Sequence, residues 1–304
     1  MSDFCQMTRD NHFKFGYDDT FFVDRVRGDQ KFSVTYGQCK SPIFDWRYHC
    51  TKSAEEISVT YKDKPIYVCL SGGIDSEVVV RSFLAANIVP KIIIIRHIGG
   101  YNLHDYCWAV GFCESEGLDY EFFDLDLIDF WESGEVDEYA KIANGISPQM
   151  CTLLKIMQHI HDLGGVAVLG ALEREFSYRK NYDSWCLTES ENFACLYRYA
   201  SKTKINVVPS FFNWSPEMLL SYMNDSYLAQ IMSQTGMPYF KSSYAKADIY
   251  GRYWSLQRRG KYAGYEKLLE YSKKHRSRLE GIYGDYSSFI FTPVNELRKI
   301  LSSS

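Results

Sequence analysis

Residues 71–76 read Ser-Gly-Gly-Ile-Asp-Ser and carry the residue types best suited to chemistry in this chain of 304 residues. A short apolar run precedes them and a helix-like run follows, which gives the order strand, glycine turn, helix. The first amides of a helix have no acceptor within the helix, and the helix dipole favours negative charge there. Two glycines let the backbone approach a phosphate closely, and Ser71 and Ser76 add hydroxyl donors. Asp75 would repel a phosphate by itself, so we expect it to hold a cation that binds one.

The six residues match at every position the signature Ser-Gly-Gly-x-Asp-Ser of the PP-loop ATP pyrophosphatase superfamily, so the loop resembles that superfamily. The Walker phosphate loop needs a Lys after its second glycine, and none stands here. Farther along, 207–217 has a Pro after an apolar run and then a Trp-Ser pair that opens a helix. That element is similar to one in sulfonucleotide reductases and their relatives. The resemblance covers about 65–225 and is nearest in motif to sulfonucleotide-reductase-like and N-type ATP pyrophosphatase members. An ordinary glycine-rich turn between strand and helix is the alternative interpretation.

The resemblance implies an enzyme that uses ATP and Mg²⁺. In the superfamily the loop binds the β- and γ-phosphates of ATP, and a carbonyl, carboxylate or amide oxygen of an acceptor attacks the α-phosphate. The products are an adenylated intermediate and pyrophosphate, after which an amine, ammonia or a sulfur nucleophile displaces AMP. Fixed amide donors and Mg²⁺ stabilise the charge that develops on the departing pyrophosphate. The acceptor is either a small molecule or a nucleobase in a nucleic acid.

By this resemblance the loop supplies most of the site residues. Asp75 is expected to bind Mg²⁺, and Asp75 and Ser76 are assigned catalytic roles. Nucleotide contacts are assigned to Leu70, Ser71, Gly72, Gly73, Ile74, Asp75 and Ser76.

Arg96 and His97 end the second predicted strand of the sheet. In relatives the end of that strand lies beside the adenine or the ribose, so both residues are assigned to nucleotide binding. A solvated strand end is the alternative for this pair, and a core histidine is a further alternative for His97.

Gly170 and the charged residues after it follow the fourth predicted strand at its carboxyl end, where ligands of α/β sheets bind. Gly170 is assigned to the nucleotide, and Glu173 is a candidate second ligand of Mg²⁺, which takes one or two carboxylates besides phosphate oxygens. Arg174 and Lys180 are assigned as catalytic residues that clamp phosphates or the acceptor. Surface charge is the alternative for each of them.

The elements that must position these residues alternate between strand and helix from 65 to about 212. Such alternation predicts an α/β fold with a doubly wound, mostly parallel five-stranded sheet and helices on both faces. The strands are expected at Ile66–Leu70, Lys91–His97, Tyr120–Leu125, Val166–Gly170 and Ile205–Phe211. The helices between them are expected at Glu77–Ala86, Asn102–Glu116 and Pro148–Leu163.

The two ends of the chain have different patterns. Phe21–Val26 and Lys31–Tyr36 flank a turn and predict an N-terminal β-hairpin, followed by a short helix over Thr51–Val59. Ser215-Pro216-Glu217 opens a helix, and an amphipathic stretch spans Tyr250–Leu279. We therefore expect an N-terminal extension (1–64), a nucleotide-binding α/β domain (65–225) and a helical C-terminal region (226–304).

Nine cysteines are scattered through the chain without a Cys-x-x-Cys pair. Most are expected to be reduced, buried and structural. Cys151 falls in the first turn of a predicted helix, where the dipole lowers a thiol pKa, but it has no nearby partner for sulfur transfer. A sulfonucleotide reductase needs a reactive Cys near its C-terminus, and no Cys follows Cys195.

Residues 241–280 hold 11 Lys and Arg against 4 Asp and Glu, a balance of +7 in a chain of net charge −4. Tyr and Trp residues are interleaved with these cations, as on surfaces that bind polynucleotides. A pair of amphipathic helices with inward aromatics is the alternative. The segment is a candidate contact for nucleic acid.

Other functions stay open beside adenylation. One is a sulfonucleotide (PAPS) reductase-like protein, and another is a module that binds nucleotide or nucleic acid without catalysis. No apolar run approaches the roughly 20 residues that span a bilayer, and the N-terminus lacks the features of a signal peptide. We expect a cytoplasmic protein without membrane contact, and the sequence does not predict its oligomeric state.

Overall fold

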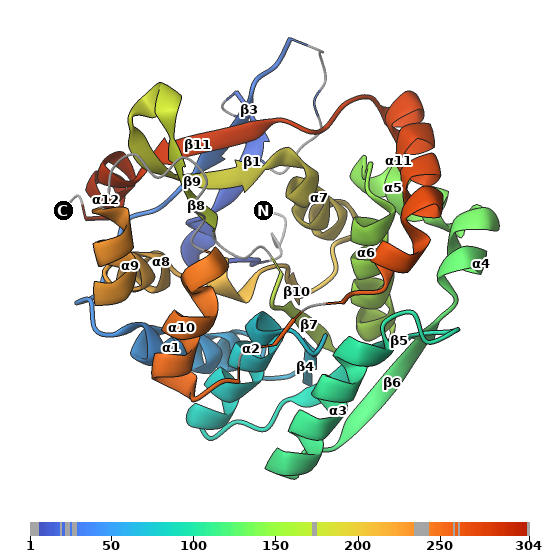
Figure 1. The fold of residues 1–304 in the computed structure, drawn as a ribbon, viewed down its shortest axis with the longest axis horizontal. Helices are drawn as coiled ribbons and strands as arrows, with labels where there is room; N and C mark the ends of the chain where they lie inside the picture. Colours follow the sequence, from blue (N-terminus) through green and yellow to red (C-terminus); the bar gives the residue numbers. More distant parts are fainter. Residues whose placement is uncertain are drawn as a thin grey trace.

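The fold was analysed in a computed structural model, in which the structure describes residues 6–18, 20–21, 25, 29–171, 175–233, 243–257, 259–260 and 262–302. Figure 1 shows a larger sheet with helices around it and two smaller sheets, one of which is formed by the N-terminal strands. No helix in these ranges is long and apolar enough to cross a membrane.

The central sheet has five strands in the order β10-β7-β4-β5-β6, and every neighbouring pair is parallel. Its strands are β4 (Ile66–Cys69), β5 (Lys91–His97), β6 (Tyr120–Leu125), β7 (Val166–Leu169) and β10 (Val207–Val208). The predicted five-stranded parallel sheet is confirmed, although β10 is shorter than the expected strand. All five strands therefore end at one edge, which is where the loop 71–76 begins.

Alternate residues of the strands face two separate cores, as the two-residue period of a strand requires. One core lies under α1, α2, α3 and α8 and receives Val68, Ile92 and Val168. The other lies under α6 and α7 and receives Tyr67, Ile93 and Ala167. Both faces of the sheet are thus covered, which confirms the doubly wound arrangement.

The helices of this layer are α1 (Trp46–Thr60), α2 (Ile74–Ala85), α3 (Leu103–Glu116), α4 (Leu127–Glu132), α5 (Glu135–Ala143), α6 (Pro148–Asp162), α7 (Ala194–Thr203) and α8 (Pro216–Met223). Two predicted starts are confirmed by their caps: Ser147 accepts a hydrogen bond from the Met150 amide, and Ser215 accepts one from the Met218 amide. Proline at the first helical position accompanies both caps. The sequence analysis does not anticipate α4, α5 or α7.

An N-terminal antiparallel sheet is present as predicted, with β1 (Lys14–Tyr17), β2 (Thr20–Phe21) and β3 (Phe32–Thr35), while residues 22–24 and 26 of the first predicted strand lie outside the described residues. β1 lies in the middle and pairs with both other strands. A second antiparallel sheet, which the sequence analysis misses, has the order β11-β9-β8. Its strands are β8 (Glu175–Arg179), β9 (Ser184–Ser190) and β11 (Phe289–Pro293).

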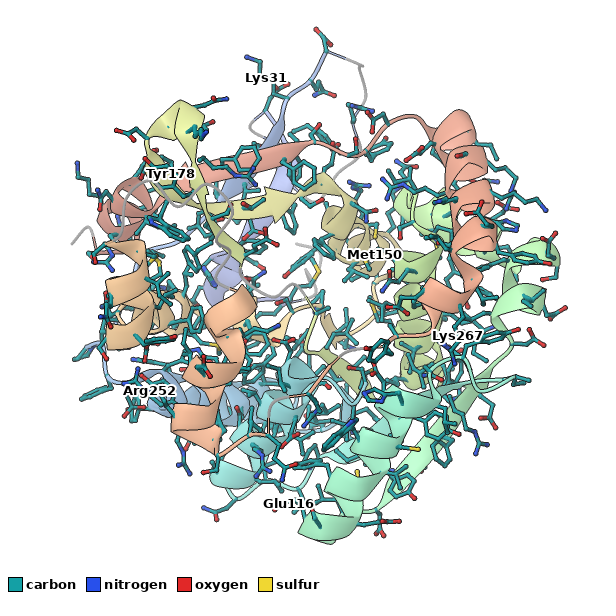
Figure 2. The ribbon with its side chains drawn as sticks, viewed as in Figure 1. Lys31, Glu116, Met150, Tyr178, Arg252 and Lys267 are labelled. Carbon is teal, nitrogen blue, oxygen red and sulfur yellow. The ribbon has the colours of Figure 1, made fainter. Side chains whose placement is uncertain are left out.

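The C-terminal region is mostly helical, as expected, with α9 (Ser226–Met232), α10 (Ser243–Trp254), α11 (Leu269–Tyr283) and α12 (Val294–Ser302), and it also supplies β11. The amphipathic stretch expected over 250–279 is divided between the end of α10 and the start of α11. Ser255 and Gly264 adopt positive φ angles of 53° and 92°, which end the helical path between α10 and α11. Figure 2 shows Arg252 and Lys267, near the two ends of this connection, on opposite sides of the molecule.

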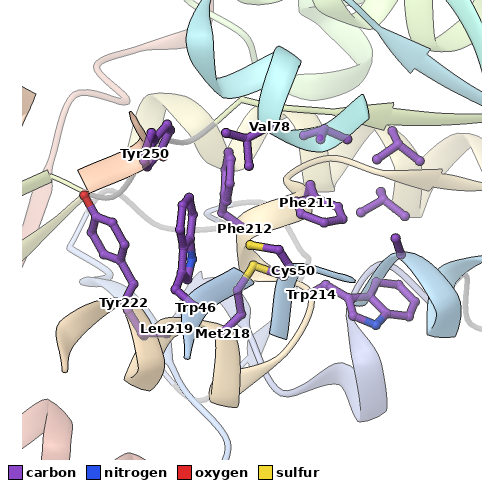
Figure 3. Close-up of a cluster of buried hydrophobic side chains, with 14 of the residues drawn as sticks. Trp46, Cys50, Val78, Phe211, Phe212, Trp214, Met218, Leu219, Tyr222 and Tyr250 are labelled. Carbon is purple, nitrogen blue, oxygen red and sulfur yellow. The ribbon is translucent and has the colours of Figure 1, made fainter. Parts of the chain in front are cut away.

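Tyr250 anchors α10 in the core. Its ring stacks on Trp46 of α1 with centroids 4.7 Å apart and lies 6.2 Å from the ring of Phe212. Figure 3 shows these three side chains together with Tyr222 in one buried cluster. The position of α10 against α1 and α2 is therefore set by aromatic packing.

Candidate nucleotide-binding site

The loop 71–76 joins β4 to α2, as predicted from the sequence. The Ser76 hydroxyl donates to the Gly73 carbonyl at 3.0 Å and accepts from the Ser71 amide at 3.1 Å. The two serine hydroxyls are 3.1 Å apart. Gly73 is the N-cap of α2 and offers no side chain to the first amides of this 12-residue helix. The Ser76 hydroxyl thus holds the loop together from within, and the Ser71 hydroxyl lies beside it at the N-terminus of α2, whose first amides have no acceptor within the helix.

Two glycines bring three segments of backbone together at this edge. Gly72 has a φ of +82°, and a Cβ there would stand 1.8 Å from the Asp105 carbonyl oxygen at the start of α3. A Cβ on Gly170, just after β7, would stand 2.9 Å from the Ser76 amide nitrogen. Only glycine fits at Gly72, because both its backbone angle and its space exclude a side chain. Gly170 is thus next to the loop, as predicted, and it supports the start of α2.

The Asp75 carboxylate is bound by two residues of α10. Lys246 Nζ lies 2.8 Å from Oδ2, and the Tyr250 hydroxyl donates to Oδ1 at 3.0 Å. The side chains of Asp75 and Lys246 are only 14% and 13% exposed. Burial, with the negative charge of Asp75 next to it, raises the pKa of Tyr250 and keeps this hydroxyl protonated as a donor. The sequence analysis places Lys246 and Tyr250 only in a basic, aromatic segment and misses their role at the loop.

Arg259 is the second cation of the C-terminal region at the loop. Its Nε donates to the Gly72 carbonyl at 2.6 Å, and its Nη2 donates to Glu77 Oε2 at 2.6 Å. The guanidinium also lies over the ring of Trp108, 5.1 Å from the centroid. Only 5% of the Arg259 side chain is exposed, so its charge is paired inside the protein and does not contribute to a positive surface. Because the guanidinium holds the Gly72 carbonyl, it also fixes the plane of the peptide that carries the Gly73 amide.

The chain on the C-terminal side of Arg259 runs across the loops that follow β4 and β5. The Tyr262 amide donates to Asp105 Oδ1 at 2.8 Å. A Cβ on Gly264 would be 2.8 Å from the Tyr101 carbonyl carbon, so the backbones touch there. The described residues of 255–265 are called the connecting segment below. Figure 1 shows it running from α10 past the N-terminal end of α2 toward α11.

Arg96 and His97 end β5 as predicted, but their surroundings differ. Arg96 is half exposed and binds Asp124 of β6 through both carboxylate oxygens, at 2.5 and 2.7 Å. His97 is 4% exposed and meets the ring of Tyr265 at 5.5 Å. Neighbouring residues of a strand point to opposite faces, which explains the difference. Of the two, His97 packs under a residue from the C-terminal region.

Burial lowers the pKa of His97 to about 4 from an ordinary 6.5. Between pH 6.5 and 4 the histidine is therefore protonated in the unfolded chain but not in the folded protein. The stability of the folded protein falls as the pH drops through this window. In His97→Phe the aromatic packing is kept and the titration is removed. On going from pH 7.5 to pH 5, the free energy of unfolding of the parent should fall by about 2 kcal/mol more than that of the variant. Urea denaturation at both pH values measures this, and a difference that is constant with pH would contradict it.

The other assigned residues are not all brought to the loop. Glu173 and Arg174 lie outside the described residues. Lys180 is exposed in the turn between β8 and β9. Figure 1 places the tip of that hairpin far from the start of α2. The structure therefore does not bring Lys180 to the loop, because the chain after β7 forms an antiparallel hairpin that carries it away.

Several of the described cations of 241–280 have acidic partners within the protein. Arg252 binds Asp225, and Lys274 and Arg278 of α11 bind Glu132 and Asp137. Exposed pairs of this kind add little stability. They do, however, use part of the positive charge that the sequence shows in this segment.

Six of the eight described cysteines are buried, as expected of structural residues, whereas Cys107 is exposed and Cys39 is partly buried. Burial raises the pKa of Cys39 and Cys195 to about 12 and that of Cys151 well above its ordinary value. The first-turn position of Cys151 therefore does not produce a reactive thiolate, because desolvation outweighs the helix dipole.

The donors at the loop fit a nucleotide with its metal ion. Two hydroxyls and a helix N-terminus suit phosphate oxygens, and Asp75 suits a hard cation. The described residues contain no cluster of three or more His, Cys, Asp or Glu that could hold a metal. Mg²⁺ does not need such a cluster, since it is commonly bound by one or two carboxylates together with substrate phosphates.

No protein-family model matches the chain, and neither does any curated protein. Among solved structures, NMN synthetase from Francisella tularensis is similar at 11% identity and a TM-score of 0.36, over 80% of this chain and 97% of that one. NAD⁺ synthetase from Burkholderia pseudomallei is similar at 13% identity and a TM-score of 0.33, over 77% of this chain and 93% of that one. Both similarities are too weak to bear on the function of this chain.

Proposed function

We propose that this protein binds ATP at residues 70–76 and cleaves it between the α- and β-phosphates to adenylate an acceptor. The observation that carries the proposal is the geometry of the loop, in which the Ser71 and Ser76 hydroxyls lie at the uncapped start of α2 and Asp75 stands in the first turn of that helix. This is the strand–loop–helix context that the superfamily signature requires. No lysine in the loop provides the charge of a Walker phosphate site.

The residues have distinct tasks in the proposed reaction. Ser71, Gly72, Gly73 and Ser76 bind the β- and γ-phosphates, and Asp75 holds Mg²⁺, which neutralises phosphate charge when bound. An acceptor oxygen displaces pyrophosphate from the α-phosphorus: the new P–O bond forms as the bond to the β-phosphate oxygen breaks. Fixed donors at the loop stabilise the negative charge that the pyrophosphate gains, and they need no rearrangement to do so.

The acceptor presents a carbonyl, carboxylate or amide oxygen, on a small molecule or on a nucleobase of a nucleic acid. Its adenylate is consumed by an amine, ammonia or a sulfur nucleophile. Arg174 and Glu173, which lie outside the described residues, remain candidates for acceptor or metal contacts from the residues after β7. The segment 241–280 remains a candidate contact for nucleic acid through its solvent-facing residues.

The products of ATP identify this reaction directly. Purified protein is incubated with ATP, Mg²⁺ and pools of carboxylates, amides, ammonia or RNA, and the products are monitored by ³¹P NMR. We expect AMP and pyrophosphate in equal amounts. Mass spectrometry of short incubations should detect an adenylated acceptor. Formation of ADP and phosphate would replace the proposal with a kinase or ATPase, and failure to bind ATP in calorimetry would overturn it.

A further inference from the structure

The two partners of Asp75 come from one face of α10, because Lys246 and Tyr250 are four residues apart on that helix. The roles of the two residues differ. Tyr250 is buried and stacked on Trp46, so its position is fixed. Lys246 is held by its ammonium group at the end of a flexible four-carbon stem. One partner of the carboxylate is thus anchored and the other is able to turn away.

The ammonium of Lys246 occupies the place that a metal ion would need. It is 2.8 Å from Asp75 Oδ2 in a pair that is largely withdrawn from water. A divalent cation on the same oxygen would stand a few ångströms from the ammonium, and like charges at that distance repel strongly in such surroundings. Lys246 and the cation therefore exclude one another at Oδ2, while the Tyr250 hydroxyl can keep its bond to Oδ1.

The phosphates offer Lys246 a new partner nearby. Asp75 lies in the first turn of α2, next to the amides and serine hydroxyls that face the anion. The four-carbon stem of Lys246 allows an ammonium that leaves Oδ2 to turn toward a phosphate oxygen bound at that turn. Such a charge-assisted bond is stronger than one from a neutral donor.

We propose that Lys246 is a further phosphate-binding residue that exchanges partners: it neutralises Asp75 without nucleotide and moves to the nucleotide phosphates when a divalent cation takes Asp75. This inference rests on the function proposed above. It predicts that one side chain opposes the binding of a cation alone and favours the binding of the cation with nucleotide.

The exchange is tested by two binding measurements on Lys246→Met and on Lys246→Gln, whose amide can still donate to Asp75. Mn²⁺ alone is titrated by electron paramagnetic resonance, and the Mg²⁺ complex of α,β-methylene-ATP, which cannot be cleaved at the α–β bond, is titrated by calorimetry. We expect Mn²⁺ to bind about tenfold more tightly and the nucleotide roughly tenfold or more weakly in both variants. Arg252→Met, which removes another α10 cation from Asp225, is the matched control and should change neither.

The decisive result is that the affinity for Mn²⁺ rises while the affinity for the nucleotide falls. If both affinities fall in both variants, Lys246 only supports the structure, and if both rise, it is only a competitor of the metal; either outcome overturns the exchange. Parent protein that binds the analogue but never releases pyrophosphate from ATP would contradict the proposed reaction and leave the exchange measurable. Parent protein that binds neither probe would contradict both.

Discussion

Asp75→Ala is expected to lower the rate of pyrophosphate release by about three orders of magnitude or more. The substitution removes the carboxylate that we assign to Mg²⁺, and a metal ion contributes several kcal/mol to stabilising charge in the transition state. It also leaves the Lys246 ammonium and the Tyr250 hydroxyl without the group that both bind. Steady-state pyrophosphate release at saturating ATP measures the effect. A binding module without catalysis would release no pyrophosphate and would lose only metal-dependent affinity on this substitution. An enzyme whose variant keeps its nucleotide turnover would contradict the role assigned to Asp75.

The chain offers a matched control for this substitution. Asp225 is also buried and also binds two residues of α10, accepting from Arg252 Nη1 at 3.3 Å and from the Tyr253 hydroxyl at 2.8 Å. Asp225→Ala should therefore loosen the docking of α10 and the start of α9 without touching the loop. We expect it to lower thermal stability and to keep most of the turnover. Equal losses of turnover in the two variants would show that α10 docking, and not the Asp75 carboxylate, is what the reaction needs.

Gly72→Ala is expected to abolish nucleotide binding and to destabilise the fold by several kcal/mol. A Cβ at this position would meet the Asp105 carbonyl oxygen at 1.8 Å, which is far inside contact distance. The φ of +82° adds roughly 1–3 kcal/mol of backbone strain for a residue with a side chain. The loop must move to relieve both, and the Gly72 carbonyl then loses the bond from Arg259. Chemical denaturation and ATP calorimetry measure the two effects.

Gly111→Ala is the control for the glycine substitution. Gly111 lies inside α3, has no φ in the positive range, and nothing stands within 4 Å of the place where its Cβ would be. Alanine there should stabilise the protein by roughly 0.5–1 kcal/mol, because glycine is costly within helices. Nucleotide affinity should be unchanged. Gly72→Ala protein with parental ATP affinity would show that the observed loop conformation is not the one that binds.

The loop itself could be predicted from sequence because its signal is local. A buried strand, two glycines and a helix start stand next to each other in residues 66–85, and the structure confirms the elements around them. The start of the helix at Pro148 is equally local and equally well predicted. These features depend on neighbouring residues, so they do not require knowledge of the tertiary fold.

The partners of the loop could not be predicted in this way. Lys246 is 171 residues from Asp75, and Arg259 is 187 residues from Gly72. Nothing in the sequence around either cation distinguishes it from the other positive charges of 241–280. Their roles follow from the aromatic docking of Tyr250, which is a property of the whole core.

The sequence of the antiparallel sheet that the sequence analysis misses does contain a strand pattern. Residues 175–179 alternate polar and apolar, with Phe176 buried and Glu175 and Arg179 only partly covered. That period of two is typical of a strand with one buried face. The sequence analysis instead assigns Lys180, the next residue, to the site because it follows the fourth strand of the parallel sheet. Strand geometry explains why Lys180 lies at a hairpin tip.

The connecting segment has a consequence for how the protein is made. Synthesis proceeds at about 5–20 residues per second, so Lys246 leaves the ribosome roughly ten to thirty seconds after Asp75. The five parallel strands are complete by residue 208, whereas the residues that bind the loop come from 246 onward. A nascent chain can thus build the sheet and the turn at 71–76 well before their covering cations exist. The contacts of the candidate site are therefore complete only with the last fifth of the chain. Translation that stops early leaves Asp75 without Lys246 and Gly72 without Arg259, while Glu77 keeps its partner Arg81.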